Sequence, residues 1–363
     1  MPINVRPPLL ACTILALICV VAQAAPVTGL ERIGTLTVPG KPLNVFDISV
    51  VNADGVYALS DRSNRGLDFF NAATGAFLGR ATGFAGYRKS TGFDAAGPNG
   101  VVAVGPSQFW AGDGNSTVKV VDWRTRKVLA SISTGGRRRT DEMAYDPRDH
   151  LVVAVNNADD PPFVSFISTR TRKLLGRLVL TRATGGAEQS VWAPASGLIY
   201  LSIPELDHVK ARGAVAVINP RTRRLIRYML VARCMPAGLA LGPKHRLLLG
   251  CSDDGVAAGF PAHSIVMTTG GRIVADLPVG GSDEVWSDLR AHRYYLAAVA
   301  NTGGPVLGVI DSLDDRWLGN LPTGPHAHSV AADARTGKVF VPVAAGAGSP
   351  CPRGCIEVFG PGK

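Results

Sequence analysis

The amino-acid sequence predicts an all-β fold built from one repeated four-stranded unit. Three observations support this prediction. The 363-residue chain contains 42 Gly and 25 Pro, a composition typical of a protein with many turns. Short β-branched runs recur between those turns, and no amphipathic pattern is long enough for an ordinary helix. Similar segments also return every 42 to 53 residues, which is the period of a four-stranded propeller blade.

Seven segments open the repeated units and contain the first strand of each. Their anchors are Asp47, Gly100, Glu142, Gln189, Gly238, Glu284 and His328. The segments 142–147 (EMAYDP), 189–194 (QSVWAP) and 238–243 (GLALGP) align most closely. We therefore predict a seven-bladed β-propeller.

The remaining strands follow each opening segment in a constant order. Second strands are predicted at 151–155, 198–202, 247–251, 294–298 and 339–343, third strands at 118–122, 214–219 and 306–311, and fourth strands at 128–133, 174–178, 225–230 and 272–277. The last unit lacks a fourth strand, whereas residues 32–39 at the other end of the chain resemble the fourth strand at 127–133. We expect the N- and C-terminal strands to pair in the last blade, because that pairing removes two unpaired edges.

The first 24 residues read as a signal peptide. Arg6 precedes an apolar run at 9–21, and Ala22-Gln23-Ala24 forms a small-residue cleavage site. A retained N-terminal anchor is the alternative. We expect residues 25–363 to form one propeller domain, periplasmic or secreted, monomeric, and without a transmembrane segment.

Four cysteines remain after signal removal. Cys234, Cys251, Cys351 and Cys355 suit two disulfides in an exported chain, although three connectivities are possible. We expect the pairs Cys234–Cys251 and Cys351–Cys355. A metal site at the CxxxC motif is the alternative.

The repeats resemble the YVTN-type repeats of YncE-like bacterial propellers. The resemblance is carried by residues 236–243 (PAGLALGP) and 118–128 (VKVVDWRTRKV), and it extends over the mature chain. It implies the propeller fold, but it says little about activity, because this superfamily contains binding proteins, lyases and hydrolases.

Polar residues at the starts of the first strands should gather around the central channel. The candidate catalytic residues are Asp141, Glu188, Asp283 and His328, and the candidate metal ligands add Glu142, Glu284 and His326. Loop residues Asn157, Asp159 and Asn301 are candidate ligand-binding residues on the same face. Adjacent strand residues point to opposite sides, so we expect each pair to contribute one member to a common centre.

These residue types allow two kinds of chemistry. Oxygen ligands suit a divalent cation such as calcium, and His326 or His328 would suit a transition metal. Without a cation, clustered carboxylates repel one another, and the pKa of one of them rises enough for general acid–base chemistry. The alternative without a functional site is a polar, water-filled channel whose Asp and Asn residues cap turns.

The sequence thus predicts an exported propeller that binds a small ligand or divalent metal at the polar mouth of its channel. A metal-dependent hydrolase or lyase at the same site is the first alternative. The gluconolactonase-like propellers, to which such an enzyme would be similar, imply a cation ringed by residues such as Glu188, Asn157, Asn301 and Asp283. No phosphate loop, HExxH or CxxCH motif is present.

A second alternative is a scaffold that binds an anionic polymer through the opposite face. The net charge is +10, and three successive units carry similar basic turns between their third and fourth strands. These turns contain Arg124, Arg126, Lys127, Arg170, Arg172, Lys173, Arg221, Arg223 and Arg224. A solvated face that keeps the protein soluble would explain the same charges.

Overall fold

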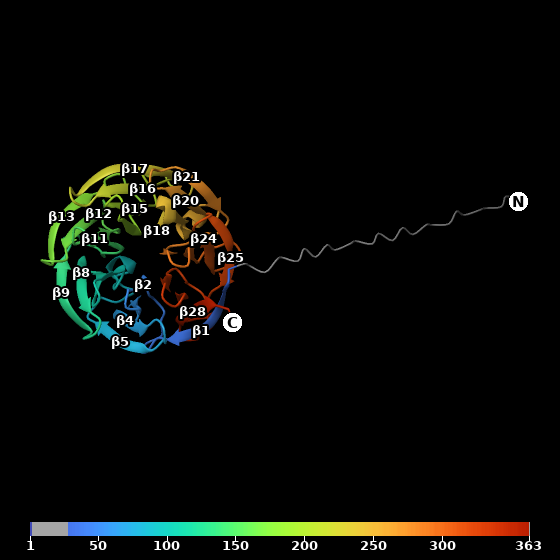
Figure 1. Ribbon diagram of the computed structural model, residues 1–363, viewed down its shortest axis with the longest axis horizontal. Coiled ribbons are helices and arrows are strands. Elements are labelled where there is room, and N and C mark those ends of the chain that lie inside the picture. The colour runs from blue at the N-terminus through green and yellow to red at the C-terminus, as the bar shows by residue number, and fades with distance from the viewer. Residues whose placement is uncertain (2–27, 363) are drawn as a thin grey trace.

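The computed structural model describes Met1 and residues 28–362. These residues form seven four-stranded antiparallel sheets arranged as a ring, so the prediction of an all-β, seven-bladed propeller is confirmed (Figure 1). The predicted signal peptide at 1–24 lies outside the described residues except for Met1. No helix within the described ranges has the length and apolar character needed to cross a bilayer.

The blades are numbered I to VII in chain order. Blade I contains β2 (Ser49–Val51), β3 (Val56–Asp61), β4 (Gly66–Asn71) and β5 (Phe77–Thr82). Blade II contains β6 (Val101–Val104), β7 (Gln108–Asp113), β8 (Thr117–Asp122) and β9 (Lys127–Ser133). Blade III contains β10 (Met143–Asp146), β11 (Leu151–Asn156), β12 (Phe163–Ser168) and β13 (Lys173–Val179). Blade IV contains β14 (Ser190–Ala193), β15 (Leu198–Ile203), β16 (Arg212–Asn219) and β17 (Arg224–Ala232).

The remaining blades follow the same order. Blade V contains β18 (Pro236–Gly242), β19 (Arg246–Cys251), β20 (Ser264–Thr268) and β21 (Ile273–Leu277), with the short helix α1 (Asp253–Ala257) between β19 and β20. Blade VI contains β22 (Val285–Asp288), β23 (Arg293–Ala298), β24 (Val306–Asp311) and β25 (Arg316–Pro322). Blade VII contains β26 (Ala331–Asp333), β27 (Lys338–Val343), β28 (Cys355–Pro361) and β1 (Leu30–Thr37).

Blade VII is built from both ends of the chain. Strand β1 pairs antiparallel with β28, from Leu30 opposite Pro361 to Thr37 opposite Cys355 (Figure 1). The Arg32 guanidinium also donates to the buried carboxylate of Glu357 at 2.6 Å. The first described strand is therefore the outermost strand of the last blade.

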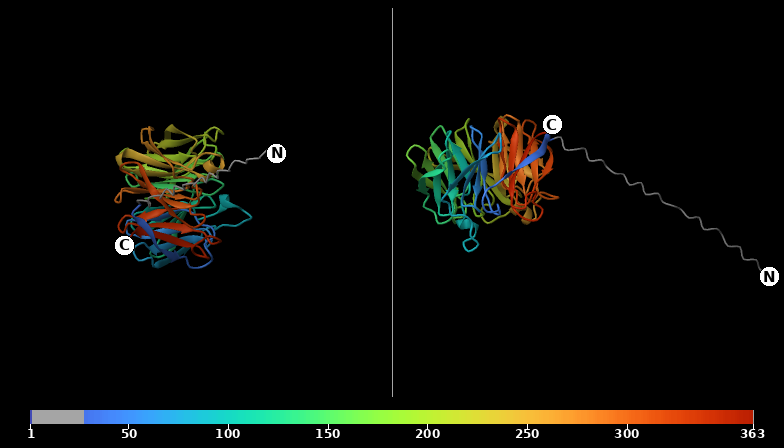
Figure 2. Two further views of the ribbon diagram at one scale, coloured as in Figure 1. Left: turned by 90° about the vertical axis from the view of Figure 1, so that its right-hand side faces the viewer. Right: turned by 90° about the horizontal axis from the view of Figure 1, so that it is seen from below.

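The hydrophobic core lies between neighbouring blades, whose flat sides face one another (Figure 2). Between blades III and IV, for example, Val153 and Phe166 are buried in the same cluster as Ile199 and Leu201. Because every sheet buries both faces, the second and third strands are apolar along most of their length. Both predicted disulfides, Cys234–Cys251 and Cys351–Cys355, are present.

Glycines in blade II allow it to approach the segment that opens blade III. A Cβ atom on Gly112 would overlap the carbonyl oxygen of Thr140, and one on Gly100 would overlap that of Asp141. These contacts involve backbone atoms, which cannot rotate away as a side chain can. The two glycines therefore fix the position of residues 140–142, which line the channel.

Candidate functional site

One end of the central channel contains two adjacent cavities, which together we call the mouth. The first, of about 350 Å³, is called the aromatic cavity because Phe46 and Phe93 line it. The second, of about 210 Å³, is called the acidic cavity. Its lining residues include Asp47, Asp141, Glu142, Glu188, Asp253, Asp254 and Asp283. Because Asp47, Arg139, Asp253 and Asp283 line both cavities, the two form one continuous polar surface.

The mouth is assembled from short segments that precede the first strands of several blades. Asp47 precedes β2, Glu188 precedes β14 and Asp283 precedes β22. Asp141 and Glu142 precede β10, and both line the acidic cavity. The expectation that only one of these two would reach the centre is therefore wrong, because the rule of alternating sides applies within a strand and this pair lies before it.

A buried ion pair stands on one side of the mouth. The Arg62 guanidinium, 4 % exposed, contacts the carboxylate of Asp47 and donates to Asn99 Oδ1 at 2.6 Å and 3.0 Å. Asn99 in turn donates to the carbonyl of Thr140 at 2.9 Å, which links blade II to the segment that opens blade III. Burial alone would raise the pKa of Asp47, but Arg62, His328 and Arg139 outweigh burial and lower it.

A second arginine pairs with a second carboxylate nearby. Arg139 Nη2 lies 2.9 Å from Asp141 Oδ2, and Arg139 Nε donates to Asn157 Oδ1 at 3.2 Å. Burial works against the charge on Arg139, but Asp141, Asp47 and Glu188 raise its pKa. The predicted ligand-binding residue Asn157 thus orients an arginine of the mouth.

His328 forms part of the wall of the aromatic cavity. Its ring stacks on Phe46 with the ring centres 4.6 Å apart, and its Nδ1 donates to the carbonyl of His326 at 2.9 Å. Its Nε2 lies 3.7 Å from Asp47 Oδ1. Burial lowers the pKa of His328, but Asp47 and Asp283 raise it by more, so the net shift is upward. His326 lines the same cavity, with a left-handed backbone (φ 56°) instead of the expected strand geometry.

Five further carboxyls of the mouth have no ion pair with an arginine or lysine within the described residues. They are Glu142, Glu188, Asp253, Asp254 and Asp283. Burial raises the pKa of Glu142 and Glu188 well above the usual range, and neighbouring carboxylates raise it further. The pKa of Asp283 rises to about 7, mainly through burial and then through Asp253, Asp47 and Asp141, while His328 opposes the rise. The mouth therefore carries more acids than its cations compensate.

Three other predicted site residues have different surroundings. Glu284 is buried and accepts hydrogen bonds from Ser329 Oγ at 2.5 Å and Val330 N at 3.2 Å, so it ties blade VI to blade VII. Asn301 bonds the backbone of Gly280 and Thr302, and it lines neither cavity of the mouth. Asp159 accepts from the backbone amides of Arg137 and Arg138 and lines a separate cavity.

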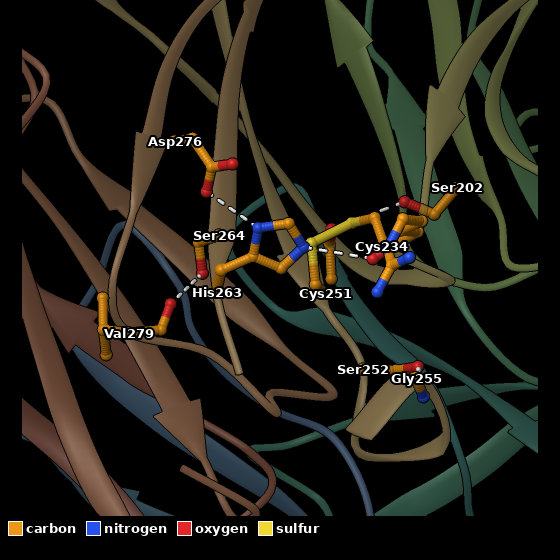
Figure 3. The surroundings of a disulfide bond; sticks show 11 residues. Ser202, Cys234, Cys251, Ser252, Gly255, His263, Ser264, Asp276 and Val279 are labelled. Atoms are coloured by element: carbon orange, nitrogen blue, oxygen red, sulfur yellow. Dashed lines mark hydrogen bonds and ion pairs between the residues drawn. A yellow bond between two sulfur atoms is a disulfide. The ribbon is translucent and has the colours of Figure 1, made fainter. Parts of the chain in front are cut away.

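The acids of the mouth do not converge on one point as ligands of a single metal ion do. In the described part of the chain, only Cys234, Cys251 and His263 bring three ligand atoms within 4.8 Å of one another (Figure 3). The two sulfur atoms of that group are bonded to each other, and a thiolate, not a disulfide, is the usual metal ligand. His263 Nδ1 instead lies 2.7 Å from Asp276, and Nε2 lies 3.2 Å from the carbonyl of Arg233. Neither place therefore brings together three His, Cys, Asp or Glu side chains that are free to ligate one metal ion.

The nine basic residues predicted to bind a polyanion lie in or next to the turns between third and fourth strands. Several of them already have partners in neighbouring blades. Arg221 lies 2.7 Å from Asp149, Arg124 lies 3.4 Å from Asp54, and Arg126 donates to the carbonyl of Leu78 at 3.1 Å. These contacts explain part of the basic pattern as a connection between blades.

Sequence reasoning missed the two arginines and the aromatic wall. Arg62 lies in the β3–β4 turn, and Arg139 ends the basic run 137–139 just before the acidic opening of blade III. Phe93 belongs to the long connection between β5 and β6. In the sequence, only the long 53-residue spacing between the first two anchors indicated this connection. An arginine run directly before an acidic strand start was the signal that could have identified Arg139.

Comparisons with known proteins support the fold and nothing finer. No protein-family model matches the chain, and no curated protein sequence matches it either. Among solved structures, hydrazine synthase from Kuenenia stuttgartiensis is similar with a TM-score of 0.66 and 12% identity, covering 86% of this chain and 96% of that one. At this identity the likeness concerns the propeller architecture alone.

Proposed function

We propose that this chain is an exported β-propeller that binds a small polar ligand at the mouth of its central channel. The observation that carries the proposal is the pair of adjacent cavities, lined by Arg62, Arg139 and more carboxyls than these two cations pair with. Such convergent polar groups in a concave site are typical of ligand recognition. Two disulfides support the exported location, because such bonds persist in oxidising compartments.

A binding screen tests this proposal. Small cations, anions and neutral sugars are screened by thermal shift, and any that stabilise the protein are measured by calorimetry. Asn44→Trp adds a bulky ring at the exposed rim of the aromatic cavity, and Ser196→Trp adds the same ring at an exposed turn on the opposite face. We expect Asn44→Trp to lose binding and Ser196→Trp to retain it. Equal binding by both variants would refute a site at the mouth.

A hydrolase or lyase is the second candidate. It is favoured by one observation: the pKa of Asp283 is raised to about 7 by burial, next to His328, so this carboxyl can exchange a proton near neutral pH. Turnover of simple lactones and esters that disappears in Asp283→Asn would support it. The metal-assisted form is not proposed, because the carboxylates do not converge on one point.

The polyanion-binding scaffold is also not proposed. Two of its nine basic residues already pair with acids of neighbouring blades, in the Arg221–Asp149 and Arg124–Asp54 contacts.

A further inference from the structure

We propose that the ligand of the mouth is a linear organic polycation, a diamine or triamine whose ammonium groups pair with the free carboxylates of the acidic cavity. This inference rests on the proposed function and names the ligand class for the same site. It follows from the balance of charges, from one buried carboxylate without a partner, and from the spacing of the acids.

The acidic cavity holds more carboxyl groups than cations. The two arginines of the mouth are already engaged, Arg62 by Asp47 and Arg139 by Asp141. Within the described residues, the other acids of the cavity have no ion pair with an arginine or lysine. They are Glu142, Glu188, Asp253, Asp254 and Asp283. An anionic ligand would meet two neutralised arginines and five unpaired acids, whereas a cationic ligand meets its complement.

Glu142 is the second and independent observation. It lines the acidic cavity and is only 8 % exposed. No hydrogen bond or ion pair from the described residues reaches its carboxyl group, whereas Glu284, which is also buried, accepts from Ser329 and Val330. Ionising a buried carboxyl group without a partner is costly, and a bound cation removes that cost by supplying the missing charge and donors.

The arrangement of the acids favours an extended cation over a metal ion. A calcium ion gathers six to eight oxygens at about 2.3–2.6 Å, so its ligands crowd one point. Here no three carboxylate ligand atoms of the mouth lie within 4.8 Å of one another in the described part of the chain. Ammonium groups separated by methylenes can instead meet carboxylates one by one around the wall of the cavity.

The aromatic cavity matches the apolar methylene chain of such a ligand. Phe93, 50 % exposed and packed against Tyr87 with the ring centres 4.7 Å apart, provides an apolar ring beside the acids, and the stacked pair of Phe46 and His328 forms the wall next to it. Aromatic faces attract ammonium groups and cover methylene chains. The combined site therefore offers carboxylates for the charged ends and rings for the chain between them.

The experiment is titration calorimetry of the full exported chain at low ionic strength. The cationic probes are 1,4-diaminobutane and spermidine, and the comparison probes are butylamine, 1,4-butanediol, succinate and Ca²⁺. We expect spermidine to bind at least ten-fold more tightly than butylamine, with no binding of butanediol. Glu142→Gln and Glu188→Gln should each weaken spermidine at least ten-fold. Asp54→Asn, which removes an exposed acid on the opposite face, should leave its affinity unchanged.

The outcomes separate the ligand class from the proposed function. One outcome is that succinate, butanediol or Ca²⁺ binds saturably, that Asn44→Trp abolishes this binding, and that the amines do not bind. This outcome would refute a polycation as the ligand class but retain the mouth as the binding site. Amine binding that neither Asn44→Trp nor Glu142→Gln reduces would overturn both. The melting temperatures of the glutamine variants serve as a control. If they stay within a few degrees of that of the wild type, a loss of affinity is not caused by unfolding.

Discussion

Replacing Asp283 by Asn should make the protein more stable at alkaline pH and leave it nearly unchanged at acid pH. Burial, followed by the nearby carboxylates, raises the pKa of this carboxyl from its ordinary value of 3.8 to about 7. The folded chain therefore holds the proton more tightly than the unfolded chain does. Its contribution to stability is fully present below about pH 4 and is lost as the pH rises toward 7, because only the unfolded carboxyl ionises freely in that range.

The expected magnitude follows from the same shift. Each pKa unit of difference between the folded and unfolded chain corresponds to about 1.4 kcal/mol. Because Asp283 is partly exposed, we take about half of the full value, which gives about 2 kcal/mol. Asn has nearly the shape of the neutral carboxyl, so the variant keeps the packing and loses only the ionisation.

Chemical denaturation at pH 4.5 and pH 8, with the disulfides intact, measures this difference. The free energy of unfolding of Asp283→Asn should exceed that of the wild type by about 2 kcal/mol at pH 8 and by less than about 0.5 kcal/mol at pH 4.5. Asp54→Asn, an exposed acid away from the mouth, serves as the control and should show no such change. An identical effect of Asp283→Asn at both pH values would refute the idea that folding raises the pKa of this carboxyl.

Two other substitutions test how the mouth is held. Arg62→Met leaves the buried carboxylate of Asp47 without its guanidinium and should cost about 3 kcal/mol of unfolding free energy in urea denaturation, whereas a cost below about 1 kcal/mol would contradict the buried pair. Gly112→Ala forces a Cβ against the carbonyl of Thr140 and should cost about 2 kcal/mol by the same assay. Gly34→Ala, at a strand glycine with open space around it, should stay within about 0.5 kcal/mol, and equal costs for the two alanines would argue against the close backbone contact.

The fold could be predicted from the sequence because the same pattern of strands and turns occurs seven times. Each copy reinforces the others, so errors of one or two residues at strand ends do not change the architecture. The positions around the channel followed from the same repetition, since equivalent residues of different blades meet near one axis.

The chemistry of the mouth could be predicted only in part. Sequence position indicates that Asp141, Glu188 and Asp283 reach the channel, but it cannot tell which acids receive a cation. That outcome depends on Arg62 and Arg139, which arrive from a turn and from the end of a basic run. Packing between blades, not the repeat, therefore decides which carboxylates remain free.

The pairing of β1 with β28 has a consequence for how the protein is made. Arg32 and Glu357, which meet in this sheet, are 325 positions apart, so the ring cannot be completed until β28 has been synthesised. A chain truncated before β26 would lack three strands of blade VII, leave β1 without its partner and expose the facing sides of blades I and VI. We therefore expect C-terminal truncations to aggregate as a whole and not to accumulate as stable six-bladed fragments.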